Sequence, residues 1–233
     1  MTALVSAKDA AALDRALASI DLDVPLRSEG CKTRQAERYA CVLLLATLPR
    51  STWAFPLCVE HDDRPDFVIV DAGVRIGVEH TEVVPENHAR ESVLRETGPG
   101  PDVYFIRPAV PGEPRKSTAR LRRQIADDAP GNAWVGDSPE RQWAGAVGYF
   151  IARKTAAASR VGFRLFDRNW LLLYEQWPLP ALDAERAAGL LRETPELQQA
   201  FALFERIFVV DDQTLWEFAP QARAVIRRVK RPG

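Results

Sequence analysis

Two extended segments joined by a tight turn constrain the fold of this chain more than any other feature. Residues 66–71 and 74–84 are rich in β-branched side chains, and Ala72-Gly73 lies between them. Glycine can supply the positive φ angle that a two-residue turn requires, so the pattern predicts an antiparallel hairpin. Residues 53–60 form a third extended segment, and we interpret the three together as an antiparallel meander.

The predicted turn also determines which residues face each other. Counting outward from the turn places Asp66 opposite Glu79, on a face that also holds Gly77 and Thr81, while the other face is apolar. Opposed residues have Cβ atoms about 4.5–5.5 Å apart, where two like charges destabilise a sheet unless something neutralises them. A divalent cation such as Mg²⁺, which accepts carboxylate, water and carbonyl oxygens, would do so, and Gly77 leaves room for a ligand.

The hairpin carboxylates also have a simpler interpretation. Asp66 follows Pro65 at a strand entrance and Glu79 lies near a sheet rim, so both side chains could be solvated, which is the commoner case for an arbitrary hairpin. A loop longer by one residue would place the two carboxylates on opposite faces. Both interpretations stay open at this point.

Further segments predict the layers around this meander. Residues 33–48, with Thr33 as the candidate cap, are apolar almost all round in their later turns, which predicts a buried central helix that ends at Pro49. Residues 169–176 form a continuous apolar run of strand length, typical of an inner strand covered on both faces. Residues 6–20 are rich in alanine at helical spacing and predict an N-terminal helix.

A lysine lies on the apolar side of another predicted helix. Residues 138–140 (Ser-Pro-Glu) form a good helix start, with the serine capping, and the helix is expected to reach about Ser159. Lys154 falls within its apolar stripe, so the ammonium either extends along the surface to water or needs a partner. The second alternative directs Lys154 at the hairpin carboxylates, while Arg153 beside it faces solvent or phosphate.

The rest of the chain predicts regular elements and two basic stretches. We expect helices at 85–100, 183–192 and 195–203, strands at 102–108, 206–212 and 214–220, a basic helix that starts within 115–124, and a basic tail at 222–233.

Composition excludes several classes of function. A net charge of -1, from 31 Lys+Arg and 32 Asp+Glu, means that any anionic partner must be met by a local patch. The three cysteines and three histidines lack ligand spacing, which indicates reduced core thiols and argues against a zinc site. The longest apolar run, residues 39–46, is too short to span a bilayer, so a cytoplasmic, soluble protein without a membrane partner is expected.

With the hairpin, the lysine helix and the buried strand in hand, the segment 34–175 resembles the core of the PD-(D/E)xK nuclease superfamily. Pro65-Asp66 matches the Pro-Asp pair of that family, and residues 79–81 (Glu-His-Thr) match its acid-x-Lys, with Thr81 in place of the lysine. The missing lysine puts activity in doubt unless another cation replaces it.

The resemblance implies an α/β (α+β) fold with a restriction-endonuclease-like αβββαβ core, in which helices flank a mixed central sheet. The core is expected to span residues 33–177, with 85–137 as an insertion. An N-terminal helical arm, residues 1–32, would precede it, and a C-terminal extension, residues 178–233, would pack on it.

The resemblance also implies a site and a cofactor. Lysine is known in this superfamily to migrate to a neighbouring element, and Lys154 fits that role. Glu37 matches the frequent helical acid of the family, although a carboxylate near a helix N-terminus is equally favoured on its own account. An ion, Mg²⁺ or Mn²⁺, would be held by Asp66, Glu79 and the backbone carbonyl of His80. The implied catalytic residues are Asp66, Glu79, Lys154, Glu37 and Thr81.

The implied partner is nucleic acid, DNA in particular, and a homodimer is compatible with the pattern. For each basic cluster the alternative is a solvated helix face or a frayed tail. The predicted phosphate contacts are Lys116, Arg120, Arg122, Arg123 and Arg153, followed by the C-terminal Arg227, Arg228, Lys230 and Arg231.

Two other functions stay open from the sequence. The first is a catalytically inactive nuclease-like module that binds nucleic acid or protein, with Thr81 marking the loss of activity. The second is a structural or interaction protein with a solvated acidic hairpin, for which Asp66 and Glu79 on opposite faces would be the evidence. In that protein the core or interface anchors would be Trp134, Trp143, Trp170, Trp177 and Trp216.

Overall fold

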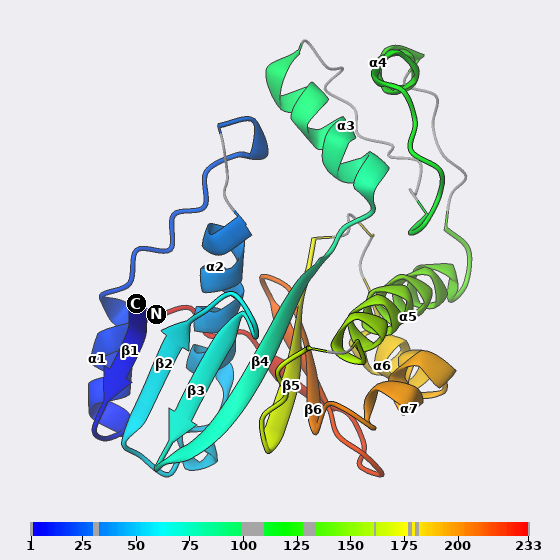
Figure 1. Cartoon of the computed structure of the whole chain (residues 1–233). Coiled ribbons are helices and arrows are strands. Elements are labelled where there is room, and N and C mark those ends of the chain that lie inside the picture. The colour runs from blue at the N-terminus through cyan, green and yellow to red at the C-terminus, as the bar shows by residue number, and fades with distance from the viewer. Residues whose placement is uncertain are drawn as a thin grey trace.

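An eight-stranded sheet forms the centre of the computed structural model, and its strands lie side by side in chain order (Figure 1). The structure describes residues 2–29, 33–98, 110–127, 134–160, 162–176, 179 and 182–232. The strands are β1 (Thr2–Ala7), β2 (Leu57–His61), β3 (Phe67–Asp71), β4 (Val74–Val83), β5 (Arg168–Glu175), β6 (Arg206–Val210), β7 (Thr214–Phe218) and β8 (Val225–Arg228).

The sheet is mixed. Strands β1 to β4 are antiparallel, β4, β5 and β6 run parallel, and β6, β7 and β8 are again antiparallel. Parallel neighbours require long crossover connections, and here helices supply both of them. The helices are α1 (Ala10–Ala18), α2 (Thr33–Thr47), α3 (Glu86–Thr97), α4 (Thr118–Asp127), α5 (Ser138–Ala158), α6 (Ala184–Arg192) and α7 (Pro195–Ala200), with short 3₁₀ turns at Arg27–Glu29 and Arg50–Thr52.

Helices cover both faces of the sheet, so the molecule has three layers. One buried cluster joins α1 and α2 to the first face, and a second joins α5, α6 and α7 to the opposite face. In β5, Trp170 and Leu172 belong to the first cluster and Leu171 and Leu173 to the second. The predicted inner strand is therefore confirmed, and the general α/β class with it.

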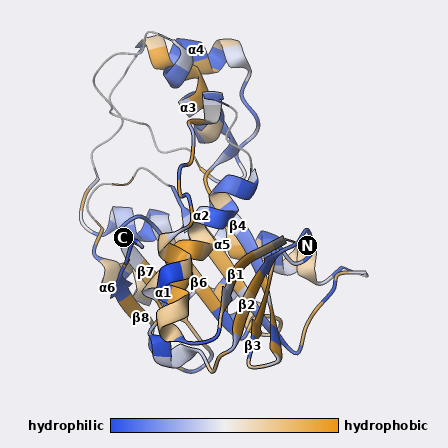
Figure 2. Cartoon of the chain, turned by 90° about the vertical axis from the view of Figure 1, so that its left-hand side faces the viewer, coloured by the Kyte–Doolittle hydropathy of each residue, from blue (hydrophilic) through white to orange (hydrophobic). Residues whose placement is uncertain are grey.

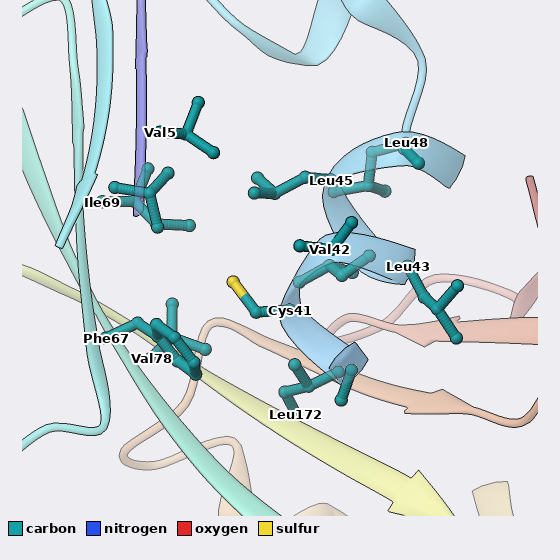
Figure 3. Close-up of a cluster of buried hydrophobic side chains, with 14 of the residues drawn as sticks. Val5, Cys41, Val42, Leu43, Leu45, Leu48, Phe67, Ile69, Val78 and Leu172 are labelled. Carbon is teal, nitrogen blue, oxygen red and sulfur yellow. The ribbon is translucent and has the colours of Figure 1, made fainter. Parts of the chain in front are cut away.

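The predicted central helix is α2. Its later residues are buried on all sides, and Figure 3 shows Cys41, Val42 and Leu45 among side chains that come from the sheet. A helix that is apolar all round is stable only in such an environment, because no face of it is compatible with water. Cys41 is a free thiol in the core, as predicted, Cys58 is a free thiol that is only half-buried, and Cys31 lies outside the described residues.

The hairpin has the predicted register. Strands β3 and β4 pair Phe67 with Val78 and Ile69 with Ile76, and the turn residues Ala72 and Gly73 both have positive φ angles. Phe67, Ile69, Ile76 and Val78 all belong to the cluster around α2. The carboxylate side of the hairpin therefore faces the opposite layer, in which α5 lies.

The insertion between β4 and α5 projects from the sheet, as Figures 1 and 2 both show for α3 and α4. Asn87 of α3 ties the two halves of the insertion together, because its side chain donates to the carbonyl of Pro114 and accepts from the amide of Lys116. Leu121 and Ile125 form the buried side of α4. The strand predicted at 102–108 lies outside the described residues.

Several sequence expectations need correction. The N-terminal arm is not purely helical, because Thr2–Ala7 forms β1 against β2 before α1 begins. The basic tail includes β8, which pairs with β7, and is therefore not a frayed segment. Ser138 is the first residue of α5, and its hydroxyl accepts from the amide of Val135 rather than capping the helix.

The tryptophans predicted as anchors lie mostly in the core. Trp143, Trp170 and Trp216 are buried, and Trp134 is half-buried. Trp177 lies outside the described residues. The three buried rings are packed within the protein and are not exposed as interface anchors.

Candidate active site

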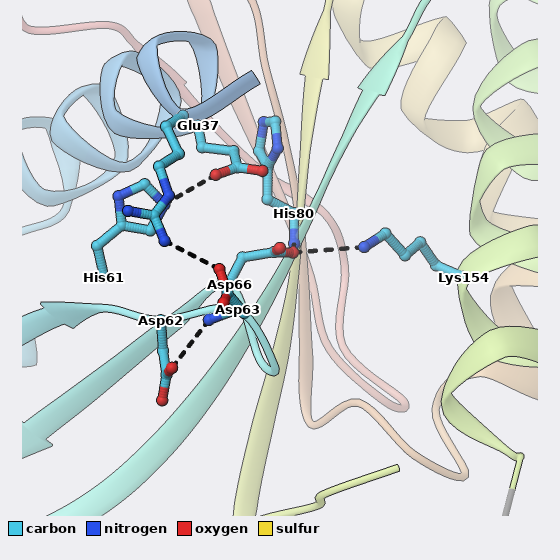
Figure 4. Close-up of polar contacts among 8 residues, drawn as sticks. Glu37, His61, Asp62, Asp63, Asp66, His80 and Lys154 are labelled. Atoms are coloured by element: carbon cyan, nitrogen blue, oxygen red, sulfur yellow. Dashed lines mark hydrogen bonds and ion pairs between the residues drawn. The ribbon is translucent and has the colours of Figure 1, made fainter. Parts of the chain in front are cut away.

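The side chains of Asp66, Glu79 and Lys154 converge on the face of the sheet that α5 covers. The Nζ atom of Lys154 donates to Oδ2 of Asp66 at 3.3 Å and to Oε2 of Glu79 at 2.8 Å. Asp66 lies one residue before β3, Glu79 lies within β4, and Lys154 lies in the last turns of α5. Figure 4 shows Lys154 reaching across from α5 toward Asp66.

The register of the hairpin explains why the two carboxylates meet. Phe67 pairs with Val78, so Asp66 extends the ladder by one residue to a position opposite Glu79. The amide of His80 donates to Oδ2 of Asp66 at 2.6 Å, which fixes the aspartate beside β4. Both carboxylates lie on the same face, as predicted, which removes the main support for the purely structural function.

Burial perturbs the ionisation of this group. Desolvation, together with the charge of Glu79, raises the pKa of Asp66 to about 6, despite the opposing effect of Lys154. Burial alone would lower the pKa of Lys154, but the carboxylates of Asp66 and Glu79 outweigh it and raise that pKa above its ordinary value. Lys154 therefore carries its positive charge at neutral pH.

Lys154 does not extend to bulk water as a snorkelling side chain would. Its side chain is 23% exposed, and those of Asp66 and Glu79 are 18% and 9% exposed. An ammonium on a mostly apolar helix side is stabilised here by two partly buried carboxylates, which offset its desolvation.

Glu37 lies on α2, close to the carboxylate pair but engaged with a histidine that the sequence did not single out. Its Oε2 atom lies 2.8 Å from Nε2 of His61 (Figure 4). The ring of His61 stacks on Phe67 at 4.6 Å between centroids. Burial acts to raise the pKa of Glu37, but the bond to His61 and the nearby charges lower it overall. Nothing in the spacing of His61 and Glu37 indicated this pair, because they lie on different elements.

His80 contributes its backbone, not its ring, to the carboxylate face. Burial lowers the pKa of the His80 ring to about 3, so the ring is neutral. Its Nε2 atom is buried and has no hydrogen-bond partner among the described residues. Thr81, two residues after Glu79 on the same face of β4, is half-buried and pairs with Leu173 of β5.

Gly77 does not leave room for a ligand, which corrects a sequence expectation. A Cβ atom on Gly77 would lie 2.7 Å from Cδ2 of Phe166 and 3.2 Å from Cγ of Pro65. The space on the carboxylate face beside Gly77 is filled by Phe166, from the segment between α5 and β5. The absence of a side chain at position 77 therefore serves the packing of Phe166.

The predicted phosphate contacts are dispersed. Arg120, Arg122 and Arg123 are exposed on α4, in the projecting insertion (Figure 1). Lys116 forms an ion pair with Glu113 at 3.1 Å. The guanidinium of Arg153 lies over the ring of Tyr149, 5.8 Å from its centroid. Arg153 is exposed on α5 and is next to Lys154 only in the chain, so none of the predicted phosphate contacts among the described residues is bonded to the carboxylates.

Some of the C-terminal basic residues form contacts within the protein. Arg227 binds Glu217 of β7 at 2.7 Å, and Arg231 lies 3.6 Å from Asp212. The amide of Lys230 donates to the hydroxyl of Thr47. Arg228 is exposed at the end of β8.

The donor set available to a metal ion is small. Within the described ranges, no group of three or more His, Cys, Asp or Glu side chains could hold a metal ion. Lys154 occupies Oδ2 of Asp66 and Oε2 of Glu79, while the other oxygen of each carboxylate accepts no hydrogen bond from the described residues. Two carboxylate oxygens and a backbone carbonyl fit Mg²⁺, which usually binds one or two carboxylates together with water and phosphate oxygens.

In the part of the chain that the structure describes, no helix has the length and apolar character needed to cross a membrane. Comparison with family models, with curated proteins and with solved structures finds no match to the chain.

Proposed function

We propose that the protein is a metal-dependent phosphodiester hydrolase that acts on nucleic acid, DNA in particular. The observation that carries this proposal is the convergence of one ammonium and two carboxylates, with Lys154 Nζ at 3.3 Å from Asp66 and at 2.8 Å from Glu79. The three residues come from a hairpin and a facing helix. Burial raises the pKa of Asp66, and perturbed carboxylates in such clusters are typical of catalytic sites.

The order of elements supports the restriction-endonuclease-like assignment. The segments α2, β2, β3, β4, α5 and β5 follow one another as helix, three antiparallel strands, helix and parallel strand, and α3 and α4 form an insertion. This order matches the αβββαβ core that the resemblance to PD-(D/E)xK nucleases implies. In such a core Asp66 and Glu79 would be the two motif acids.

Each residue has a role in this proposal. Asp66, Glu79 and the carbonyl of His80 would hold Mg²⁺ or Mn²⁺, with Glu37 as a water-mediated neighbour. When bound, the ion lowers the pKa of a water and stabilises charge on the phosphodiester oxygen. Lys154 supplies a fixed positive charge beside the phosphate, where negative charge develops during hydrolysis. Thr81, at the motif position, is uncharged and cannot perform this role.

The test is cleavage by the purified protein. We expect plasmid or single-stranded DNA to be cut in Mg²⁺ or Mn²⁺ and not in a chelator, and Asp66→Ala and Glu79→Ala to abolish cutting. Asp63→Ala is the matched control, because Asp63 is 85% exposed and pairs with Arg34, not with Lys154. RNA substrates in the same assay would show whether the protein cleaves DNA, RNA or both. Equal activity of all three variants would refute the assignment.

A second function is favoured by one specific observation. Lys154 already neutralises part of the carboxylate charge without an ion, and Thr81 replaces the usual lysine, which fits an inactive module that binds nucleic acid or protein. Calorimetry decides between the two functions: no binding of Mn²⁺, with no cleavage, favours the inactive module. A cytoplasmic location and a homodimer stay predictions.

A further inference from the structure

Two exposed arginines share one aromatic ring on the carboxylate face of the sheet. The guanidinium of Arg75, in β4, lies 5.3 Å from the ring centroid of Phe166, and that of Arg164 lies 4.6 Å from the same centroid. Neither arginine forms an ion pair within the described residues. Two like charges held near each other without a carboxylate partner favour the binding of an anion between or beside them.

The Phe166 ring, which both arginines contact, has a fixed position. The side chain of Asn169 accepts from the amide of Phe166 at 3.0 Å and donates to its carbonyl at 2.6 Å. Gly77 lies directly beneath the ring, since a Cβ there would come within 2.7 Å of Cδ2 of Phe166. The sheet itself therefore fixes the position of Phe166, and cation–π contacts worth about 0.5–1 kcal/mol each can orient both guanidinium groups.

This pair lies in line with the candidate active site. Arg75, Gly77 and Glu79 alternate along β4, so their side chains point to one face. At about 3.3 Å per residue, the Cα of Arg75 lies roughly 13 Å from that of Glu79, a distance that about four nucleotides of one strand would span. By contrast, the arginines of α4 lie in the projecting insertion.

We propose that Arg75 and Arg164 form a phosphate-binding subsite for the nucleic acid backbone, a few nucleotides from the carboxylates. The inference rests on the proposed function and extends it to the path of the substrate. The planar guanidinium group matches two phosphate oxygens at once, and such contacts position a strand without regard to its sequence. Phe166 acts through the arginines as a positioning residue.

The test measures DNA binding in an Asp66→Asn background, in which no cleavage interferes. We expect Arg75→Ala with Arg164→Ala to weaken binding of a labelled DNA oligonucleotide at least tenfold at low salt. The slope of log affinity against log salt should fall by about 2, because two phosphate contacts are lost. Arg223→Ala, an exposed arginine near the C-terminus, is the matched control and should change neither value.

Conservative variants separate phosphate recognition from a loss of folding. Arg75→Lys and Arg164→Lys keep the charge but lose the paired donors, so we expect them to retain most of the salt slope and to lose part of the affinity. In the active protein the alanine pair should raise KM for DNA more than it lowers kcat. Thermal unfolding within experimental error of the parent confirms that the fold is intact.

The outcomes for this subsite and for the proposed function are distinguishable. If the parent protein cuts DNA and the alanine pair changes neither affinity nor salt slope, the subsite is wrong and the hydrolase stands. If the parent neither cuts DNA nor binds metal, the hydrolase is wrong, and a selective loss of DNA binding in the alanine pair would still support the subsite.

Discussion

The amine of Lys154 lies 2.8 Å from a carboxylate oxygen of Glu79, although the two residues are 75 positions apart in the chain. The strand β4 presents Glu79 to one face, and α5 crosses that face with Lys154 in its last turns. A partly buried ammonium is stabilised by such a partner, and a carboxylate in the same environment is stabilised by a cation. The relationship is reciprocal, so a change at either residue leaves the other uncompensated.

Replacing Lys154 with methionine keeps most of the unbranched side chain, one heavy atom shorter, and removes its charge. We expect cleavage to fall by about 100-fold, because a fixed charge near the reacting phosphate is lost. In the presence of a chelator, the variant should also lose about 2 kcal/mol of unfolding free energy, since two partly buried carboxylates lose the ammonium that neutralises them. Urea unfolding and a plasmid assay measure the two effects, and Lys154→Arg, which keeps the charge, should lose less of both. A fully active Lys154→Met would contradict the proposed role.

The position of Thr81 permits a rescue experiment. Thr81 lies two residues after Glu79 on the same face of β4, and the proposed resemblance to PD-(D/E)xK nucleases predicts a lysine at this position. Adding Thr81→Lys to Lys154→Met should return an ammonium to the carboxylates and raise activity about tenfold over the single variant. Thr81→Met in the same background is the control for size. Equal activity of the Thr81→Lys and Thr81→Met variants would show that a lysine at position 81 does not reach the carboxylates.

The raised pKa of Asp66 predicts a particular dependence of stability on pH. Its folded pKa of about 6 lies above its ordinary value of 3.8, so the native state retains a proton that the unfolded state releases. The free energy of unfolding should therefore fall by up to about 3 kcal/mol as the pH rises from about 4 to about 6.

Asp66→Asn lacks this titration and provides the comparison. Urea unfolding of both proteins in a chelator, between pH 4 and pH 7, gives the difference in stability, from which other titrating groups such as Glu37 largely cancel. We expect the free energy of unfolding of Asp66→Asn, relative to that of the parent, to rise as the pH rises across that range. Parallel curves would mean that Asp66 titrates near its ordinary value.

Gly77 offers a test of the packing beneath Phe166. Gly77→Ala places a methyl group within 2.7 Å of the ring, which the sheet cannot absorb without moving Phe166. We expect a loss of about 1–3 kcal/mol in unfolding free energy and weaker DNA binding through displaced arginines. Gly145→Ala is the matched control, because Gly145 is an exposed glycine of α5 with open space around it, and this change should stabilise by up to about 1 kcal/mol. Equal stability of the two variants would exclude tight packing at Gly77.

We expect the arginines of α4 to contribute to DNA binding but not to the cleavage step. Arg122→Ala with Arg123→Ala should weaken DNA binding and flatten its salt dependence by about 2 in slope, with kcat unchanged. The two side chains are exposed on the projecting insertion, so the fold should not be affected. Salt titrations of binding measure the slope, and an unchanged slope would remove α4 from the interface.

Local patterns in the sequence were sufficient for the elements that carry the carboxylates. The Ala72-Gly73 turn sets the register of β3 and β4, because a two-residue loop allows one alignment in which both faces keep their polarity. The apolar helix α2 and the inner strand β5 also followed from periodicity, because only a covered position suits segments without a polar face. Lys154 was identified because its charge conflicts with the side of the helix on which it lies.

Other features depend on which distant segments meet, and no local pattern encodes that. The strands β1 and β8 form by pairing with sheet edges, so their short sequences resemble a helix start and a basic tail until those edges exist. The pair of Glu37 with His61 joins a helix to a strand. The grouping of Arg75 and Arg164 on one ring requires the α5–β5 connection to fold back over Gly77.

The sequence by itself determined the hairpin, its two facing carboxylates and a lysine that needed a partner, because turn geometry and side-chain alternation act over a few residues. Only the tertiary structure decided that α5 lies over β4, so that Lys154 meets Asp66 and Glu79 and is left only partly exposed. The physical reason is that packing of the whole apolar core sets the placement of a helix on a sheet, and one side chain on that helix contributes little to it.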